Sequence, residues 1–93
     1  MRSGKENWKE DDILFRYFLV PEELVSPQIG PYRSFGIEAQ RDGSTDWQRV
    51  AFVSDVSVDK AFVERLAAQC SAGQLDPTQL LDVVEDALAE NAF

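Results

Sequence analysis

The stretch Asp59–Glu90, DKAFVERLAAQCSAGQLDPTQLLDVVEDALAE, decides the fold of this chain. It contains two segments in which apolar residues recur with the period of an α-helix. Only Gln74 and Leu75 separate Gly73, which suits a helix end, from Asp76, which suits a helix start. The sequence therefore predicts two helices that fold back on each other as a hairpin.

The second helix has a start signal at Asp76-Pro77-Thr78-Gln79. Asp can accept hydrogen bonds from the free amides of a first turn, and proline suits the first helical position. Gln79 stands where a capping box has Glu or Gln. One face of this helix collects the apolar residues Leu80, Leu81, Val83, Val84, Ala87 and Leu88. We expect Leu80, Val84 and Leu88 to lie in the core.

The first helix shows the same division between an apolar and a polar side. Either Ser57 or Asp59 can cap its start, and we expect Gly73 to end it in the left-handed conformation. Its polar residues are Lys60, Glu64 and Ser71. Its apolar side comprises Phe62, Val63, Leu66, Ala67 and Cys70.

Three segments before the hairpin are rich in β-branched and aromatic residues and read as strands: 13–20, 32–41 and 47–54. Residues 42–46 contain an Asp-Gly pair that is typical of a hairpin turn. Residues 21–31 hold three prolines and a glycine, so we expect a loop there, with at most one helical turn at 22–25.

Both faces of the first strand are largely apolar, which suggests that it is central in the sheet. One face carries Ile13, Phe15, Tyr17 and Leu19, and the other carries Leu14, Arg16, Phe18 and Val20. In the second strand we expect Phe35, Ile37 and Ala39 to point toward the helices and Gly36, Glu38 and Gln40 to point away.

The predicted fold class is α+β, a three-stranded antiparallel meander followed by a two-helix hairpin packed on one face of the sheet. We expect a single domain over residues 12–91, preceded by a flexible segment over residues 1–11 from which Trp8 can fold back. Two helices cannot also cover the second face of the sheet, so large apolar side chains of the first strand must face outward or be covered by something else.

Several segments resemble a family of short bacterial proteins of unknown function. They are YFLV, YRSFGIEAQ, VSDVSVDKAFVERLAAQC and LDPTQLLDVVEDAL, which together span roughly residues 13–88. None of these segments is a motif with known chemistry. The resemblance therefore implies a shared fold and transfers no activity.

Composition excludes several classes of protein. The 93 residues include 17 acids and 9 bases, a net charge of −8 that argues against direct nucleic-acid binding. No apolar run approaches membrane-spanning length, and a cytoplasmic protein without a membrane partner is the expectation. A single cysteine excludes an internal disulfide and a cysteine-clustered zinc site.

No catalytic constellation stands out, and we expect neither an enzyme nor a cofactor. The chain has no histidine, the commonest general base and metal ligand. Cys70 lies on an apolar helix face and suits a buried small hydrophobe better than a nucleophile. Asp55, between the last strand and the hairpin, suits a cap or a turn better than a site.

Four acids lie along the polar face of the second helix: Asp82, Glu85, Asp86 and Glu90. A straight row of carboxylates cannot surround a metal ion, so a solvated face is the simpler interpretation. The functional hypothesis is that these residues bind a basic protein partner. Like charges at i, i+4 weaken a helix slightly, and a helix selected for stability alone would gain from a lysine there.

The leading functional hypothesis is a non-enzymatic protein-interaction module, with the acidic helix face or the open sheet face as its binding surface. A homodimer through Leu14, Arg16 and Phe18 is one form that such binding can take. The alternative is an acidic inhibitor that mimics nucleic acid, as some phage proteins do, although four arginines interrupt the predicted sheet. An enzyme that relies on carboxylates would need a cleft in which acids converge.

Overall fold

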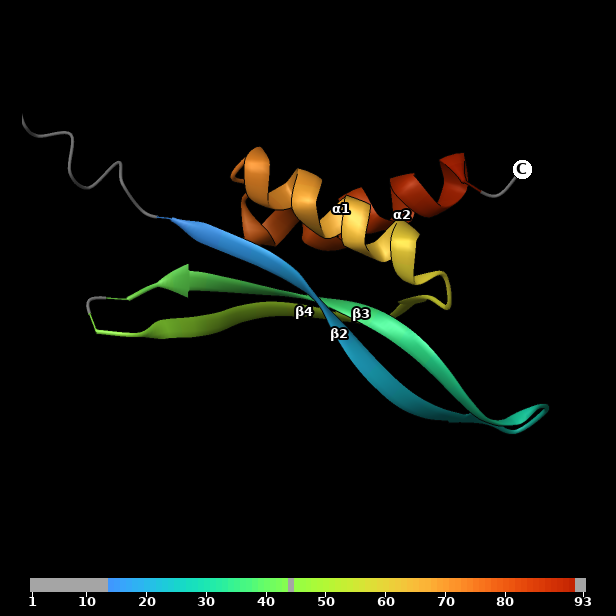
Figure 1. The fold of residues 1–93 in the computed structure, drawn as a ribbon. Helices are drawn as coiled ribbons and strands as arrows, with labels where there is room; N and C mark the ends of the chain where they lie inside the picture. The colour runs from blue at the N-terminus through green and yellow to red at the C-terminus, as the bar shows by residue number, and fades with distance from the viewer. Residues whose placement is uncertain (1–13, 44, 92–93) are drawn as a thin grey trace, which may run out of the picture.

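The computed structural model describes residues 14–43 and 45–91. The predictions for residues 1–11, for Trp8 and for Ile13 lie outside this part of the chain. Within it, three antiparallel strands precede two helices, and both helices lie on one face of the sheet (Figure 1). The predicted α+β meander with a helical hairpin is confirmed.

The sheet has the order β2–β3–β4. Its strands are β2 (Phe15–Ser26), β3 (Gly30–Asp42) and β4 (Trp47–Ser57). The central strand is therefore β3, and the prediction that the first strand is central is wrong. The loop between β3 and β4 contains the predicted Asp-Gly turn, in which the Gly43 amide donates to the Asp46 carbonyl at 2.9 Å.

The helical layer consists of α1 (Lys60–Ala72), a short 3₁₀ turn η2 (Pro77–Gln79) and α2 (Leu80–Glu90). Most contacts of α1 with the sheet are to β2, while α2 contacts β4. The two helices therefore lie side by side over the two edges of one sheet face (Figure 1).

The prediction of a loop at residues 21–31 is wrong. β2 and β3 pair without interruption from Phe15 and Arg41 to Ser26 and Gly30, and only a tight turn over residues 27–29 joins them. Figure 1 shows that this ribbon extends well beyond the helices.

The prolines of this segment fit a strand because of their positions. Pro21 lies on the edge of β2 that faces away from β3, where the ladder needs no N–H group. Pro31 lies in the part of β3 that does not pair with β4, because the last residue pair between these strands is Phe35 with Ser57. Pro27 is in the turn, and Gly30 provides the left-handed conformation there with φ 81°.

The core lies between the sheet and the helical hairpin. Ile37 and Ala39 are completely buried, so the predicted inward face of the second strand is confirmed. On β2 the covered side carries Tyr17, with Phe15 and Leu19 partly buried beside it. All five predicted residues of α1 are buried as well: Phe62, Val63, Leu66, Ala67 and Cys70.

Leu80 and Val84 of α2 are buried as predicted, but Leu88 is 37% exposed, so its assignment to the core is wrong. The reason is that α2 contacts the sheet and α1 through a narrow stripe of its surface. Leu81 and Leu88 are seven residues apart and share one direction on the helix, beside the stripe that contacts β4 and α1. A helix at the edge of a sheet buries only a narrow stripe, and Leu81 is accordingly 54% exposed.

Two of the predicted caps are confirmed. The Asp59 carboxylate accepts from the Phe62 amide at 3.2 Å, and the Asp76 carboxylate accepts from the Thr78 amide at 3.0 Å. Gln79 makes no side-chain capping bond, because the first turn after Asp76 is a 3₁₀ turn rather than the start of α2.

The predicted left-handed end of α1 is displaced by one residue. Gly73 remains right-handed with φ −86°, and Gln74 adopts φ 50° instead. Gln74 is held there by its side chain. The side-chain amide donates to the carbonyls of Ser71 and Phe15, both at 2.8 Å, and its oxygen accepts from the Phe15 amide at 2.9 Å.

Gln74 and Ser71 together occupy the outer edge of β2. The Ser71 hydroxyl accepts from the Tyr17 amide at 2.8 Å and bonds the Tyr17 carbonyl at 3.0 Å. These are the backbone groups of Phe15 and Tyr17 that an additional strand would bind. Side chains from the end of α1 thus replace a neighbouring strand along this part of the edge.

We predict that Gln74→Ala exposes the backbone of Phe15. The Phe15 amide should exchange with solvent markedly faster, and stability should fall by about 1 kcal/mol because the two side-chain hydrogen bonds to Phe15 and the one to Ser71 are lost. Hydrogen exchange measured by NMR tests this, with Gln69→Ala on the exposed side of α1 as the control. Unchanged exchange at Phe15 would contradict the role of Gln74.

We also predict that Val84→Asp lowers the free energy of unfolding by several kcal/mol. Val84 is only 2% exposed, and the new carboxylate would be buried without a partner. Chemical denaturation measures the loss, and Leu81→Asp on the exposed flank of the same helix is the matched control. Equal stability of the two variants would refute the placement of α2.

Candidate functional site

The face of the sheet opposite the helices carries three rows of side chains that the strand register aligns across β2, β3 and β4. Directly paired residues share one face of an antiparallel sheet. The rows are Leu14, Asp42 and Trp47; Arg16, Gln40 and Arg49; and Phe18, Glu38 and Phe52. We call these nine residues the open face.

Hydrogen bonds connect the polar side chains of the open face into one network. Arg49 donates to Glu38 Oε1 at 2.7 Å, and Gln40 donates to Glu38 Oε2 at 2.6 Å. Arg16 donates through Nε to the Gln40 side-chain oxygen at 2.8 Å. The chain Arg16–Gln40–Glu38–Arg49 therefore spans all three strands.

Both arginines also lie over aromatic rings. The Arg16 guanidinium carbon is 4.2 Å from the centre of the Trp47 ring and 5.8 Å from that of Phe18. The Arg49 guanidinium carbon is 4.9 Å from the centre of the Phe52 ring. Cation–π attraction adds to the hydrogen bonds and holds each guanidinium close to the aromatic rings of the sheet.

Glu38 is 7% exposed although, within residues 14–43 and 45–91, both helices lie on the other face of the sheet. Neighbouring side chains cover it instead, and its two carboxylate oxygens are both occupied. The hydrogen bond from Arg49 is the main reason that the pKa of Glu38 lies below its usual value, and burial opposes this shift. Glu38 therefore stays ionised and anchors the network.

The residues predicted as an interface, Leu14, Arg16 and Phe18, all lie on the open face. Leu14 is 47% exposed and Phe18 36%. Sequence reasoning missed Trp47, Arg49 and Phe52, which belong to the same surface. The signal that could have identified them is that an arginine and an aromatic residue alternate on both outer strands.

The four acids predicted to bind a partner, Asp82, Glu85, Asp86 and Glu90, are all exposed on α2. In the part of the chain that the structure describes, none of them forms a salt bridge. They belong to the helical layer, so the structure does not bring them together with the open face (Figure 1). The nucleic-acid mimic stays an untested prediction, and the arginines of the open face break any continuous acidic surface.

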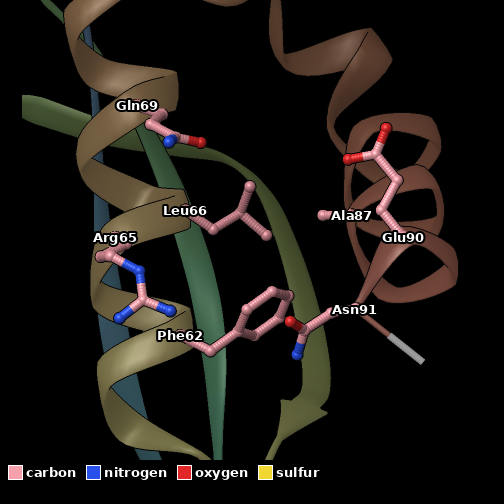
Figure 2. Close-up of a pocket in the computed structure, with 7 residues that line it drawn as sticks. All are labelled: Phe62, Arg65, Leu66, Gln69, Ala87, Glu90 and Asn91. Atoms are coloured by element: carbon pink, nitrogen blue, oxygen red, sulfur yellow. The ribbon is translucent and has the colours of Figure 1, made fainter. Parts of the chain in front are cut away.

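A cleft of about 320 Å³ separates the ends of α1 and α2. In Figure 2, Phe62 and Leu66 point into the space between the helices, and Glu90 and Asn91 lie on the α2 side. Arg65 is the basic residue of the lining. Among the residues that line this cleft, Glu90 is the one carboxylate and Arg65 the one base, so the lining does not offer a pair of acids for general acid–base chemistry.

Asp55 lies in β4 and does not cap α1, because the cap is Asp59. It has φ 54° and lies where the pairing of β3 and β4 shifts register between Phe35 and Ile37. Its carboxylate accepts from the Ser34 hydroxyl at 2.6 Å and from the Tyr32 hydroxyl at 2.7 Å.

The Asp55 amide donates to Glu22 Oε1 at 2.7 Å, and the Ser54 hydroxyl bonds the other Glu22 oxygen at 2.8 Å. The hydrogen bond from Ser34 is the main cause of a lowered pKa at Asp55. This cluster therefore joins the projecting β2–β3 ribbon to the end of β4, and its carboxylates are already occupied.

Cys70 is 5% exposed, which confirms its interpretation as a buried small hydrophobe. Burial raises the pKa of its thiol, so the reactive thiolate is disfavoured. No group of three or more potential ligands is arranged to hold a metal ion within residues 14–43 and 45–91. None of the helices in this described region is long and apolar enough to cross a membrane.

A family model for a family of unknown function, DUF6514, matches residues 2–90. The chain belongs to this family. The predicted resemblance to a family of unknown function is therefore confirmed. No curated protein and no solved structure matches the chain.

We predict that Arg49→Ala raises the pKa of Glu38, because the variant removes the main hydrogen bond that favours the ionised form while burial remains. The lowered pKa of Glu38 contributes stability above the usual carboxyl range, and this stability is lost as the pH falls through the lowered value. Because the pKa of Glu38 in the variant is closer to its unfolded value, this contribution shrinks, and the variant should lose less stability than the wild type as the pH falls.

NMR titration of the Glu38 side-chain carboxyl carbon measures this shift. Arg33→Ala is the matched control, because Arg33 pairs with the exposed Glu23 at 2.7 Å and lies outside the network. An unchanged Glu38 pKa in Arg49→Ala would show that the network does not hold the carboxylate.

Proposed function

We propose that the protein is a non-enzymatic protein-interaction module of the cytoplasm that binds through the open face. The observation that carries this proposal is the Glu38 network, which holds Arg16 and Arg49 near aromatic rings on the sheet face that neither α1 nor α2 covers. Arginine and tryptophan are the residue types that most often dominate binding energy in protein interfaces.

Order in the free protein supports binding. A long side chain that becomes fixed on association loses about 0.5–1.5 kcal/mol of rotamer entropy. In the free protein, a hydrogen bond and at least one aromatic ring already hold Arg16 and Arg49. Binding a partner would therefore cost these side chains little additional rotamer entropy. A rigid polar-aromatic surface also presents a defined pattern that a partner can match.

The chemistry of the carboxylates supports a role other than catalysis. Glu38 and Asp55 each accept hydrogen bonds through both oxygens, and both have lowered pKa values. A general base at neutral pH works best with a pKa near 7, so shifts in this direction make a carboxylate a weaker base. The buried thiol of Cys70 is likewise a poor nucleophile.

The acidic face of α2, Asp82, Glu85, Asp86 and Glu90, is a second surface that fits a basic partner. Solubility at a net charge of −8 explains the same residues more simply. The two surfaces lie on different layers, so substitutions can test them separately.

Capture from cell lysate by the immobilised protein tests the proposal. Phe18→Arg places a charge in the open face, and Leu81→Arg makes the same charge change at an exposed leucine of α2. We expect Phe18→Arg to capture at least tenfold less of the partner than the wild type, and Leu81→Arg to capture as much as the wild type. Equal capture by both variants would refute binding through the open face.

The double variant Asp82→Lys with Asp86→Lys forms the second arm of this experiment. If the acidic face binds a basic partner, this variant loses that partner, and the wild-type complex weakens as salt rises. If capture and its salt response are unchanged, the acidic face is solvated surface. Thermal melting of every variant controls for folding.

A further inference from the structure

The open face differs in charge from the rest of the molecule. It holds two cations, Arg16 and Arg49, and two anions, Glu38 and Asp42, which cancel. The full net charge of −8 therefore lies outside it. A second copy of the chain is repelled by most of the surface, and the open face is where two copies can meet without net repulsion.

We infer that the open face binds the open face of a second copy, an inference that rests on the proposed function and names its partner. Identical surfaces can associate closely when a two-fold axis brings unlike groups together. The order of the rows on this sheet allows one two-fold axis that places unlike groups opposite each other.

The axis runs across the strands, between the row of Arg16, Gln40 and Arg49 and the row of Phe18, Glu38 and Phe52. It places Arg16 opposite Phe18 of the second copy and Arg49 opposite Phe52 of the second copy. Gln40 then faces Glu38 of the second copy, so the centre of the interface opposes no groups of like charge. Arg49, which lies over Phe52, gains a second aromatic neighbour, and Arg16, which lies near Trp47 and Phe18, gains a third.

The neighbouring rows agree with this arrangement. Val20 and Gly36 pair in the row beyond Phe18 and Glu38. The same axis places the exposed Leu14 opposite Val20 of the second copy, so two apolar side chains meet there. An axis along the strands would instead place Arg16 against Arg49 of the second copy, where two cations would repel each other.

The size of the face sets the strength of the dimer. The three rows of the open face and the adjoining Val20–Gly36 row, about 6.8 Å apart on strands about 4.8 Å apart, give a footprint of roughly 400 Å² on each copy. Standard stable interfaces bury about 800 Å² of accessible surface on each partner. The dimer is therefore reversible and depends on protein concentration.

Salt should strengthen this dimer. Two molecules of net charge −8 repel each other at long range, and salt screens that repulsion. The contacts across the interface are short and mostly apolar or cation–π, so they are screened less. A complex of the acidic helix face with a basic partner would respond in the opposite direction.

Analytical ultracentrifugation of the full chain tests the inference, from about 10 µM to about 1 mM protein and at about 0.05 M and 0.5 M NaCl. We expect a dimer fraction that grows with concentration and a dissociation constant several-fold lower at the higher salt. A monomer at every concentration and both salts would overturn the inference.

Phe18→Arg and Leu81→Arg again form a matched pair, because each changes the net charge from −8 to −7. The first places an arginine opposite Arg16 of the second copy and should weaken the dimer at least tenfold, and the second should not. If Phe18→Arg fails to fold, Leu14→Arg at the 47% exposed end of the same surface replaces it. A dimer weakened by Leu81→Arg alone would refute the open face as its interface.

The outcome is separable from that of the lysate experiment. If the chain is monomeric but loses a captured protein on Phe18→Arg, the second-copy inference fails and the interaction module stands. If the dimer forms and no other protein is captured through the open face, the second copy is the partner of that face.

Discussion

Two helices can cover only one face of a three-stranded sheet, and most features of this structure follow from that constraint. The covered face holds the apolar core around Ile37, Val63 and Leu80. The other face must remain compatible with water while it carries aromatic residues. Glu38 makes this face polar, because its buried carboxylate holds arginine and glutamine side chains over a surface that would otherwise be apolar.

The helices and the antiparallel meander could be predicted because each rests on local patterns, whereas the apolar composition of β2 wrongly suggested that it is the central strand. The residues of α1 repeat with helical period, and Asp59 and Asp76 are recognisable starts. The ends of the strands in the ribbon over residues 15–42 could not be predicted from sequence. A proline interrupts a strand only where the neighbouring strand needs an N–H donor at that position. Whether Pro21 faces β3 or solvent depends on the register, which local composition does not reveal.

The candidate site was predicted in part for the same reason. Alternation along the first strand grouped Leu14, Arg16 and Phe18 correctly. It could not show that Arg16 lies over Trp47, since those residues are brought together only when β3 sets the register on both sides. Leu88 shows the converse error, because helical period gives the direction of a side chain but not the width of the surface that covers it.

The projecting β2–β3 ribbon divides the sheet into two mechanical parts. Beyond Glu22 each strand has a single neighbour and no helix above it, and Val25 and Ile29 near the turn are more than two-thirds exposed. A two-stranded ribbon has little stability of its own. The Glu22–Asp55 junction therefore marks a boundary beyond which the strands can separate locally while the helix-covered half remains folded.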